Sequence, residues 1–165
     1  YLTKKENINE YPKFIGLTTS RQICMALDEK GYYATDASYL FTIKKDMKLN
    51  YKFVLAILNS NTFQFLYNTA YQGGQRIIPQ IKAVNLYNLP FPIKELKSFK
   101  PAIQNNIIRI VDSLFHLNKD LHAATLTTQR EQIQRAIDHT ERKIDELVYE
   151  LYGLSEEEMR IVEGV

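Results

Sequence analysis

The sequence has few of the features that mark secreted or membrane-bound proteins. It contains 1 cysteine, Cys24, among 165 residues, so no internal disulfide can form. No stretch approaches the roughly 18 consecutive apolar residues of a membrane span, and the first residues, YLTKKE, lack a signal-peptide pattern. We therefore expect a cytoplasmic protein without a membrane partner. We also expect Cys24, between Ile23 and Met25, to be buried in the core.

The sequence also lacks a catalytic constellation. Asn88–Phe91 is one residue from the Asn-Pro-Pro-Phe of amino-methyltransferases, but the Gly-rich strand-to-helix loop of a cofactor site is missing. Glu141–Lys143 matches half of a nuclease metal site, yet it falls on the polar face of a predicted helix. The histidines, His116, His122 and His139, lack the spacing that places two imidazoles on one helical face. We expect no catalytic residue, no metal site and no cofactor in this chain.

What the sequence does have is the composition of an ordinary folded protein, with 45% hydrophobic and 24% charged residues. Its length fits one domain, or a compact domain with a helical appendage. The chain begins with Tyr1 rather than Met, which indicates a piece of a longer polypeptide whose catalytic domain would lie elsewhere.

The charges divide the chain into a basic part and an acidic part. Residues 1–100 hold 14 Lys and Arg against 7 Asp and Glu, whereas residues 101–165 hold 7 against 12. The basic part indicates a polyanionic partner, and the acidic part is poorly suited to lie along phosphates. Lysines on solvated faces would give the same excess by chance, so the charge alone leaves both explanations open.

The first part of the chain predicts a small antiparallel sheet followed by two helices. β-branched and aromatic residues broken by Gly and Asp predict strands at 14–17, 23–27, 32–34 and 39–43, with a turn at 28–31. Helical spacing follows, with Phe53 and Ile57 on one helix and Phe63 and Tyr67 on the next. The residues between the helices, 59–61, favour caps, so we expect Asn59 or Ser60 to cap the second helix.

From Pro101 onward the apolar spacing is helical throughout. The second predicted helix, from about Thr128 to Tyr152, repeats like a short heptad and needs a helical partner, most simply the preceding helix. Gly153 is placed to end this helix, and Ser155 with Glu158 forms a capping box for a last short helix.

These elements together predict an α+β fold. We expect a small, mainly antiparallel sheet with helices over residues 1–98, followed by a helical hairpin over residues 99–165.

A polar segment from Tyr71 to Lys82 surrounds Gly73–Gly74 and is predicted as a loop leading to an edge strand near Phe91. In a DNA major groove Arg pairs with guanine and Gln with adenine, while Lys contacts phosphate. The candidate DNA-contacting residues are Arg21, Lys44, Lys45, Gln72, Gln75, Arg76, Gln80 and Lys82. A loop whose polarity serves only solvation is the alternative explanation.

Three motifs occur in the order and approximate spacing of a known family: Leu58-Asn59-Ser60, Pro79-Gln80-Ile81-Lys82 and Leu89-Pro90-Phe91-Pro92. The Gly31-Tyr32-Tyr33 turn and the tail from Ile144 to Glu158 also fit. The chain resembles the TaqI-like C-terminal specificity domain of type IIG restriction-modification enzymes and related adenine-specific DNA methyltransferases.

The resemblance implies a non-catalytic module that reads the sequence of double-stranded DNA. It implies an upstream adenine methyltransferase domain that uses S-adenosylmethionine, and in some parents a nuclease domain that uses Mg²⁺. The adenine would be flipped into that absent domain. Because base-reading residues vary between members, the resemblance does not assign them here. Two rivals remain: half of a type I specificity subunit, and a helical protein-interaction module without DNA binding. A helix-mediated dimer is also left open.

Overall fold

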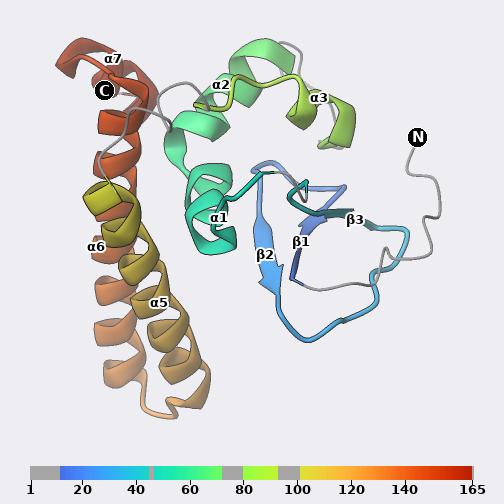
Figure 1. Ribbon diagram of the computed structural model, residues 1–165. Helices are drawn as coiled ribbons and strands as arrows, with labels where there is room; N and C mark the ends of the chain where they lie inside the picture. The colour runs from blue at the N-terminus through green and yellow to red at the C-terminus, as the bar shows by residue number, and fades with distance from the viewer. Residues whose placement is uncertain (1–11, 45–46, 72–79, 93–100, 165) are drawn as a thin grey trace. The chain divides into compact units, whose positions relative to one another are not determined.

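A computed structural model of the chain describes residues 12–44, 47–71, 80–92 and 101–164. The chain divides into two compact units (Figure 1). The first unit comprises Tyr1–Asn59 and Phe63–Pro90, and the second comprises Ser60–Thr62 and Phe91–Val165. The predicted domain boundary between residues 98 and 99 lies outside the described residues and stays a prediction.

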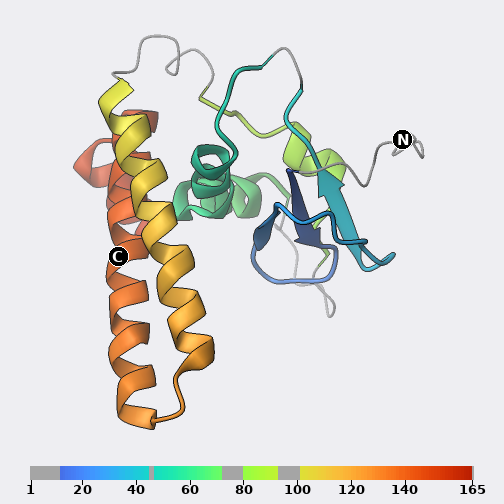
Figure 2. The ribbon, with the colours of Figure 1, turned by 60° about the horizontal axis from the view of Figure 1, so that its bottom comes forward.

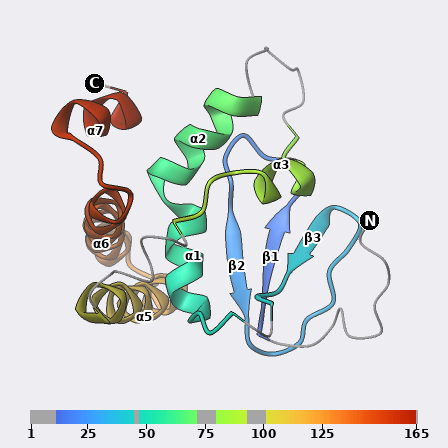
Figure 3. The same ribbon diagram turned by 45° about the horizontal axis from the view of Figure 1, so that its top comes forward.

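The first unit contains a three-stranded sheet in the order β2-β1-β3. Its strands are β1 (Lys13–Leu17), β2 (Met25–Asp28) and β3 (Ser38–Phe41), and β1 pairs antiparallel with both neighbours (Figure 3). β2 and β3 therefore run in the same direction, and residues 29–37 return the chain to the end of the sheet where β1 finishes. The predicted antiparallel sheet is confirmed.

Two sequence predictions about this sheet are wrong. Residues 32–34 are not a strand, because they belong to the connection that crosses from the end of β2 to the start of β3. Cys24 is exposed, whereas Ile23 and Met25 on either side of it are buried. Extended backbone alternates its side chains between two faces, so apolar neighbours in sequence place Cys24 on the solvent side.

The helices α1 (Tyr51–Asn59) and α2 (Asn61–Tyr71) follow the sheet, as predicted, with a break at Ser60. α1 packs against β2 (Figure 3). The buried face of α1 includes Phe53 and Ile57. Phe63 and Tyr67 of α2 are also buried, because residues four apart lie on one face of a helix.

The segment after residue 80 differs from the sequence prediction. A short helix, α3 (Ala83–Tyr87), stands where no helix was expected, and the described residues 88–92 contain no strand. The edge strand was expected near Phe91. The pairing that the structure has instead is an isolated antiparallel bridge between Gln80 and Thr19. Five residues are too few to show a helical period in the sequence, so pattern reasoning missed α3.

The second unit contains an antiparallel pair of long helices, α5 (Pro101–Ala123) and α6 (Thr127–Tyr152), followed by the short helix α7 (Glu156–Glu163). α5 and α6 pack along each other and are joined by a short turn (Figure 2). The predicted seam of α6 is buried at Ile137, Ile144 and Leu151. The α+β class with C-terminal helices is confirmed.

The helix ends in the second unit follow their sequence signals. Gly153 ends α6 with a φ of 68°, a left-handed conformation that glycine adopts without strain. The Ser155 side chain accepts a hydrogen bond from the Glu158 N–H, and the Glu158 carboxylate accepts one from the Ser155 N–H, which completes the capping box. None of the described helices is both long and apolar enough to cross a membrane.

Candidate nucleic-acid interface

The segment Gln80–Lys82 is held in an extended conformation beside the end of β1. The Ile81 N–H donates a hydrogen bond of 2.9 Å to the Thr18 carbonyl, and Gln80 bridges to Thr19. Ile81 is buried, while Gln80 and Lys82 on either side of it are exposed. Because side chains alternate along extended backbone, burial of Ile81 turns the two predicted DNA-contacting side chains outward.

The Tyr67 hydroxyl fixes this segment from the side of α2. Tyr67 is 1% exposed, and its hydroxyl accepts a hydrogen bond of 3.1 Å from the Lys82 N–H. The same hydroxyl donates to the Gln80 carbonyl at 3.4 Å. Sequence analysis found Tyr67 only as an apolar helix residue, because the spacing of a helix face reveals burial and not the partner of a hydroxyl.

Arg21 lies in the same region of the first unit. It is exposed and follows Thr19, the bridge partner of Gln80, by two residues in the turn between β1 and β2. The Gln22 N–H donates to the Ser20 hydroxyl at 3.2 Å, which orders this turn locally. The structure therefore places Arg21, Gln80 and Lys82, three of the predicted residues, within two residues of the Thr19–Gln80 bridge. We call this set the Gln80 surface.

Lys44 is exposed but lies toward the opposite end of the sheet. β3 begins opposite Leu17 and reaches Phe41 opposite Phe14, so the chain has already moved to the beginning of β1 when it reaches Lys44. The Ile43 N–H donates to the Tyr51 hydroxyl at 3.2 Å, which holds this end of the chain. The other predicted residues, Lys45, Gln72, Gln75 and Arg76, lie outside the described residues.

Side-chain amides close the outer edge of β2, which sequence analysis did not foresee. The Met25 N–H donates to Asn59 Oδ1 at 2.8 Å, and Asn59 Nδ2 donates to the Met25 carbonyl at 2.9 Å. The Ile23 N–H donates to Gln64 Oε1 at 2.6 Å. Asn59 thus replaces a neighbouring strand, where sequence analysis had offered it, or Ser60, as a helix cap. An edge bonded in this way is protected against pairing with another chain.

A buried ion pair joins β1 and β2 at the end of the sheet remote from the Gln80 surface. Lys13 Nζ lies 2.8 Å from Asp28 Oδ2, and both side chains are almost fully buried. Burial raises the pKa of the Asp28 carboxyl, but hydrogen bonds from the Lys13 ammonium and from three backbone N–H groups bring it below the ordinary 3.8. The Asp28 carboxyl is therefore ionised at neutral pH.

The second unit includes the short stretch Ser60–Thr62. The Asn61 N–H and Nδ2 donate to the Asp145 carboxylate at 2.8 and 2.9 Å. Burial raises the pKa of Asp145 to about 6, against the effect of the Asn61 N–H, and the charges of Glu141 and Glu163 raise it further. This carboxyl therefore carries a proton more readily than an exposed aspartate.

The described residues contain no group of three or more His, Cys, Asp or Glu that could hold a metal ion. Glu141 and Lys143 are both exposed on α6.

A family model described as the TaqI-like C-terminal specificity domain matches residues 2–91, more than half of the chain. The chain belongs to this family. The match covers both β1 and the Gln80 surface, and it ends where the first unit ends. Among curated proteins no match is found.

Membership of the TaqI-like specificity domain family indicates DNA sequence recognition in restriction-modification enzymes. Specificity domains are generally non-catalytic. The family therefore implies interaction with DNA, and the Gln80 surface lies within the matched residues.

Proposed function

We propose that this domain reads double-stranded DNA for a type II, IIG-like restriction-modification enzyme and positions the DNA for an upstream adenine methyltransferase domain. The observation that carries the proposal is the match of residues 2–91 to the specificity-domain family. The parent would use S-adenosylmethionine for methylation, and Mg²⁺ if it also contains a nuclease. Such an enzyme acts on DNA in the cytoplasm.

The residues of the Gln80 surface suit two different tasks at a DNA groove. The Gln80 amide can both donate and accept, which matches the edge of an adenine, whereas Lys82 offers a charge to a phosphate. Arg21 can serve either task, because its guanidinium pairs with guanine or with phosphate. We extend the proposal to Gln72, Gln75 and Arg76 as base-reading candidates, and to Lys44 and Lys45 as phosphate contacts, on their chemistry alone.

Charge supports the assignment of DNA contact to the first unit. The residues of the first unit hold 11 Lys and Arg against 6 Asp and Glu, whereas those of the second hold 10 against 13. The excess of positive charge in the first unit attracts a phosphate backbone, and the excess of negative charge in the second unit repels it. The helices of the second unit are therefore assigned to the protein side of the enzyme.

Selection from a pool of random duplexes tests the proposal, with binding measured at about 50 and 200 mM salt. We expect a short motif to be enriched, with affinity that falls steeply as salt rises. Lys82→Ala should reduce the slope of log affinity against log salt by about 1 for all sequences. Gln80→Ala and Arg76→Ala should relax the preference at single positions of the motif.

Lys119→Ala is the matched control, because Lys119 is an exposed lysine on α5 in the acidic second unit. Its affinity and salt slope should equal those of the unaltered chain. Binding without an enriched motif would contradict sequence reading. Salt-independent binding of a protein partner with no DNA affinity would favour the helical interaction module, and a second specificity repeat upstream in the parent would favour a type I subunit.

A further inference from the structure

The turn after β2 exposes two adjacent tyrosines. The side chains of Tyr32 and Tyr33 are 59% and 82% exposed. The turn that carries them, residues 28–33, lies where Lys13 and Asp28 pair, at the beginning of β1. The proposed Gln80 surface gives these two tyrosines no role.

This turn is fixed by three part-buried hydrogen bonds and by the buried ion pair of Lys13 and Asp28. The Asp28 carboxylate accepts hydrogen bonds from the backbone N–H groups of Lys30, Gly31 and Tyr32, at 2.8, 3.0 and 2.7 Å. The Lys13 ammonium lies 2.8 Å from the same carboxylate. Gly31 has a φ of 84°, which completes the turn and favours glycine. The backbone that presents the two rings is therefore ordered before any ligand binds.

A preordered turn that presents tyrosines has the properties of a binding element. A tyrosine ring offers a large contact area with few rotatable bonds, so little conformational entropy is lost on binding. The stabilising contacts of the turn are made by Asp28 and Lys13, which leaves the ring of Tyr33 in solvent. A ring on the outside of a duplex can pack against the sugars and the exposed edges of the bases, a contact that needs no particular sequence.

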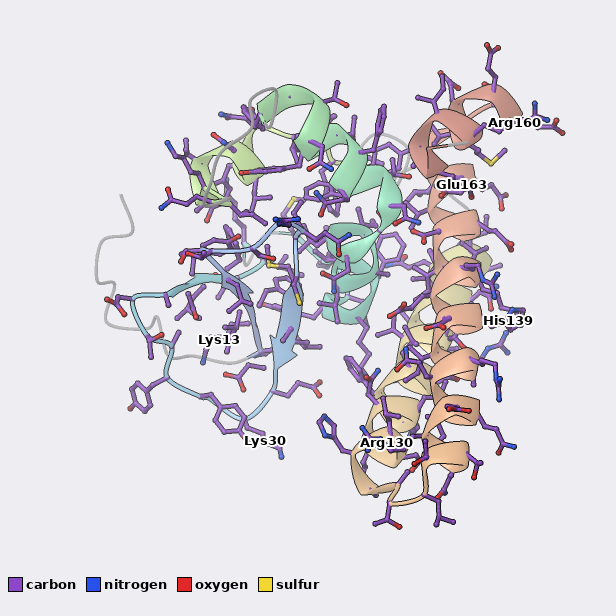
Figure 4. The ribbon with its side chains drawn as sticks, turned by 180° about the vertical axis from the view of Figure 1, so that it is seen from behind. Lys13, Lys30, Arg130, His139, Arg160 and Glu163 are labelled. Atoms are coloured by element: carbon purple, nitrogen blue, oxygen red, sulfur yellow. The ribbon has the colours of Figure 1, made fainter. Side chains whose placement is uncertain are left out.

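The position of the turn relates it to the Gln80 surface. β1 runs from Lys13 to Leu17, so at a rise of about 3.3 Å per residue its first and last Cα atoms are separated by roughly 13 Å. A B-DNA major groove is about 12 Å wide. Lys30 and Lys44 are exposed at the same end as the tyrosines, and Glu29 is the exposed acidic neighbour (Lys13 and Lys30 are labelled in Figure 4).

We infer that the turn of residues 28–33 is a second DNA-contacting element, in which the Tyr33 ring packs against the duplex and Lys30 contacts a phosphate. The inference rests on the proposed function and adds a contact that carries no sequence information. The Gln80 surface reads one side of a groove, and the tyrosine turn holds the DNA at the other end of the same strand.

Affinity measurements on the 165-residue chain test this inference with a duplex that contains the enriched motif. Tyr33→Ala should weaken binding about tenfold, because the variant loses the apolar area that the ring buries against the duplex. The slope of log affinity against log salt should stay unchanged, because the lost contact carries no charge. Tyr33→Phe should keep the affinity, since it keeps the ring. Lys30→Ala should instead reduce the slope by about 1.

Leu126→Ala is the control for removal of an exposed apolar side chain, because Leu126 is 65% exposed in the second unit. Its affinity should be that of the unaltered chain. Equal affinity of Tyr33→Ala and the unaltered chain would overturn the inference and leave the proposed function intact. A loss shared by Tyr33→Phe would also overturn it, because the hydroxyl would then be the contact. Failure of the unaltered chain to bind any duplex would overturn both proposals.

Discussion

Gly16 occupies the centre of the sheet, where its two cross-strand neighbours leave no room for a side chain. Its Cα partners are Met25 on β2 and Tyr39 on β3. A Cβ at this position would collide with the Tyr39 ring and lie 2.6 Å from the Met25 sulfur. Met25 can move its flexible end, but the buried Tyr39 ring cannot move without shifting its neighbours.

We therefore expect Gly16→Ala to lower the free energy of unfolding by about 1–3 kcal/mol, the usual cost of overpacking a core. Urea denaturation followed by circular dichroism measures this change. Ala26→Ser is the control, because Ala26 is exposed on the adjacent strand β2 and should change stability by less than about 0.5 kcal/mol. If Gly16→Ala and the unaltered chain had equal unfolding midpoints, the Tyr39 ring would be able to move aside without loss of stability.

Single residues also mark where sequence reasoning stops. The exposure of Gln80 and Lys82 could be expected from their polarity, but the juxtaposition with Arg21 could not. It depends on a bridge between residues 19 and 80, and the alternation of apolar and polar residues contains no information on long-range pairing. For Cys24 the sequence prediction of burial was wrong, because its apolar neighbours, Ile23 and Met25, were taken to lie on the same face as the cysteine.

At the scale of elements, Asn59 links α1 to the edge of β2 through two hydrogen bonds with Met25. Asn59→Ala would leave the Met25 N–H and carbonyl without these partners. We expect a loss of about 1–3 kcal/mol in the free energy of unfolding, measured by thermal or urea denaturation. Asn68→Ala is the matched control, since Asn68 is an exposed asparagine on α2 whose side chain accepts a hydrogen bond from Gln64 in the same helix. A similar loss in both variants would contradict the role of Asn59.

The Tyr67 hydroxyl joins α2 to the segment that carries the candidate site. Tyr67→Phe removes its hydrogen bonds to Gln80 and Lys82 but keeps the buried ring. We expect a loss of about 1 kcal/mol in stability, faster hydrogen exchange at the Lys82 amide, and weaker discrimination between target and non-target duplexes. Tyr71→Phe on the same helix is the control and should leave all three unchanged. Unaltered exchange at Lys82 would show that the segment is held without the hydroxyl.

Most elements could be predicted from the sequence, and the exceptions share a physical cause. α1, α2, α5 and α6 were found because each is long enough to repeat an apolar face, and α7 because its capping box is a local signal. α3 is too short for a period. Tyr32 and Tyr33 are residue types that favour strands. The Asp28 carboxylate nevertheless accepts hydrogen bonds from the backbone N–H groups of residues 30–32, which stabilises a turn instead.

At the scale of the whole molecule, the two units should respond oppositely to acid. The folded-state pKa of Asp28 lies below 3.8, so its contribution to the stability of the first unit is present above that pH and is lost as the pH falls through the lowered pKa. The folded-state pKa of Asp145 is raised from 3.8 to about 6, so its contribution to the second unit is fully present below 3.8 and is lost as the pH rises through about 6.

We expect acidification from neutral pH to about 4 to stabilise the second unit, and further acidification to destabilise the first. Hydrogen exchange resolved by residue separates the two responses, with amides of α6 reporting one unit and amides of β1 the other. Asp145→Asn should remove much of the gain in the second unit, because an amide does not titrate. If Asp145→Asn shows the same gain as the unaltered chain, the gain comes from other carboxyls, such as Glu141, whose pKa is raised by partial desolvation and by the charge of Asp138.

The second unit is assembled from two separate stretches of chain, since Ser60–Thr62 lie within it while the residues on both sides belong to the first unit. A crossover between related genes that joins one partner's residues 1–92 to another partner's helices would bring a foreign Asn61 to a foreign Asp145. Asn61 and Asp145 therefore stay matched in such a hybrid only when residues 60–62 are exchanged together with the helices. A stretch of three residues thus limits where the chain can be divided, although it lies far in sequence from the helices that it contacts.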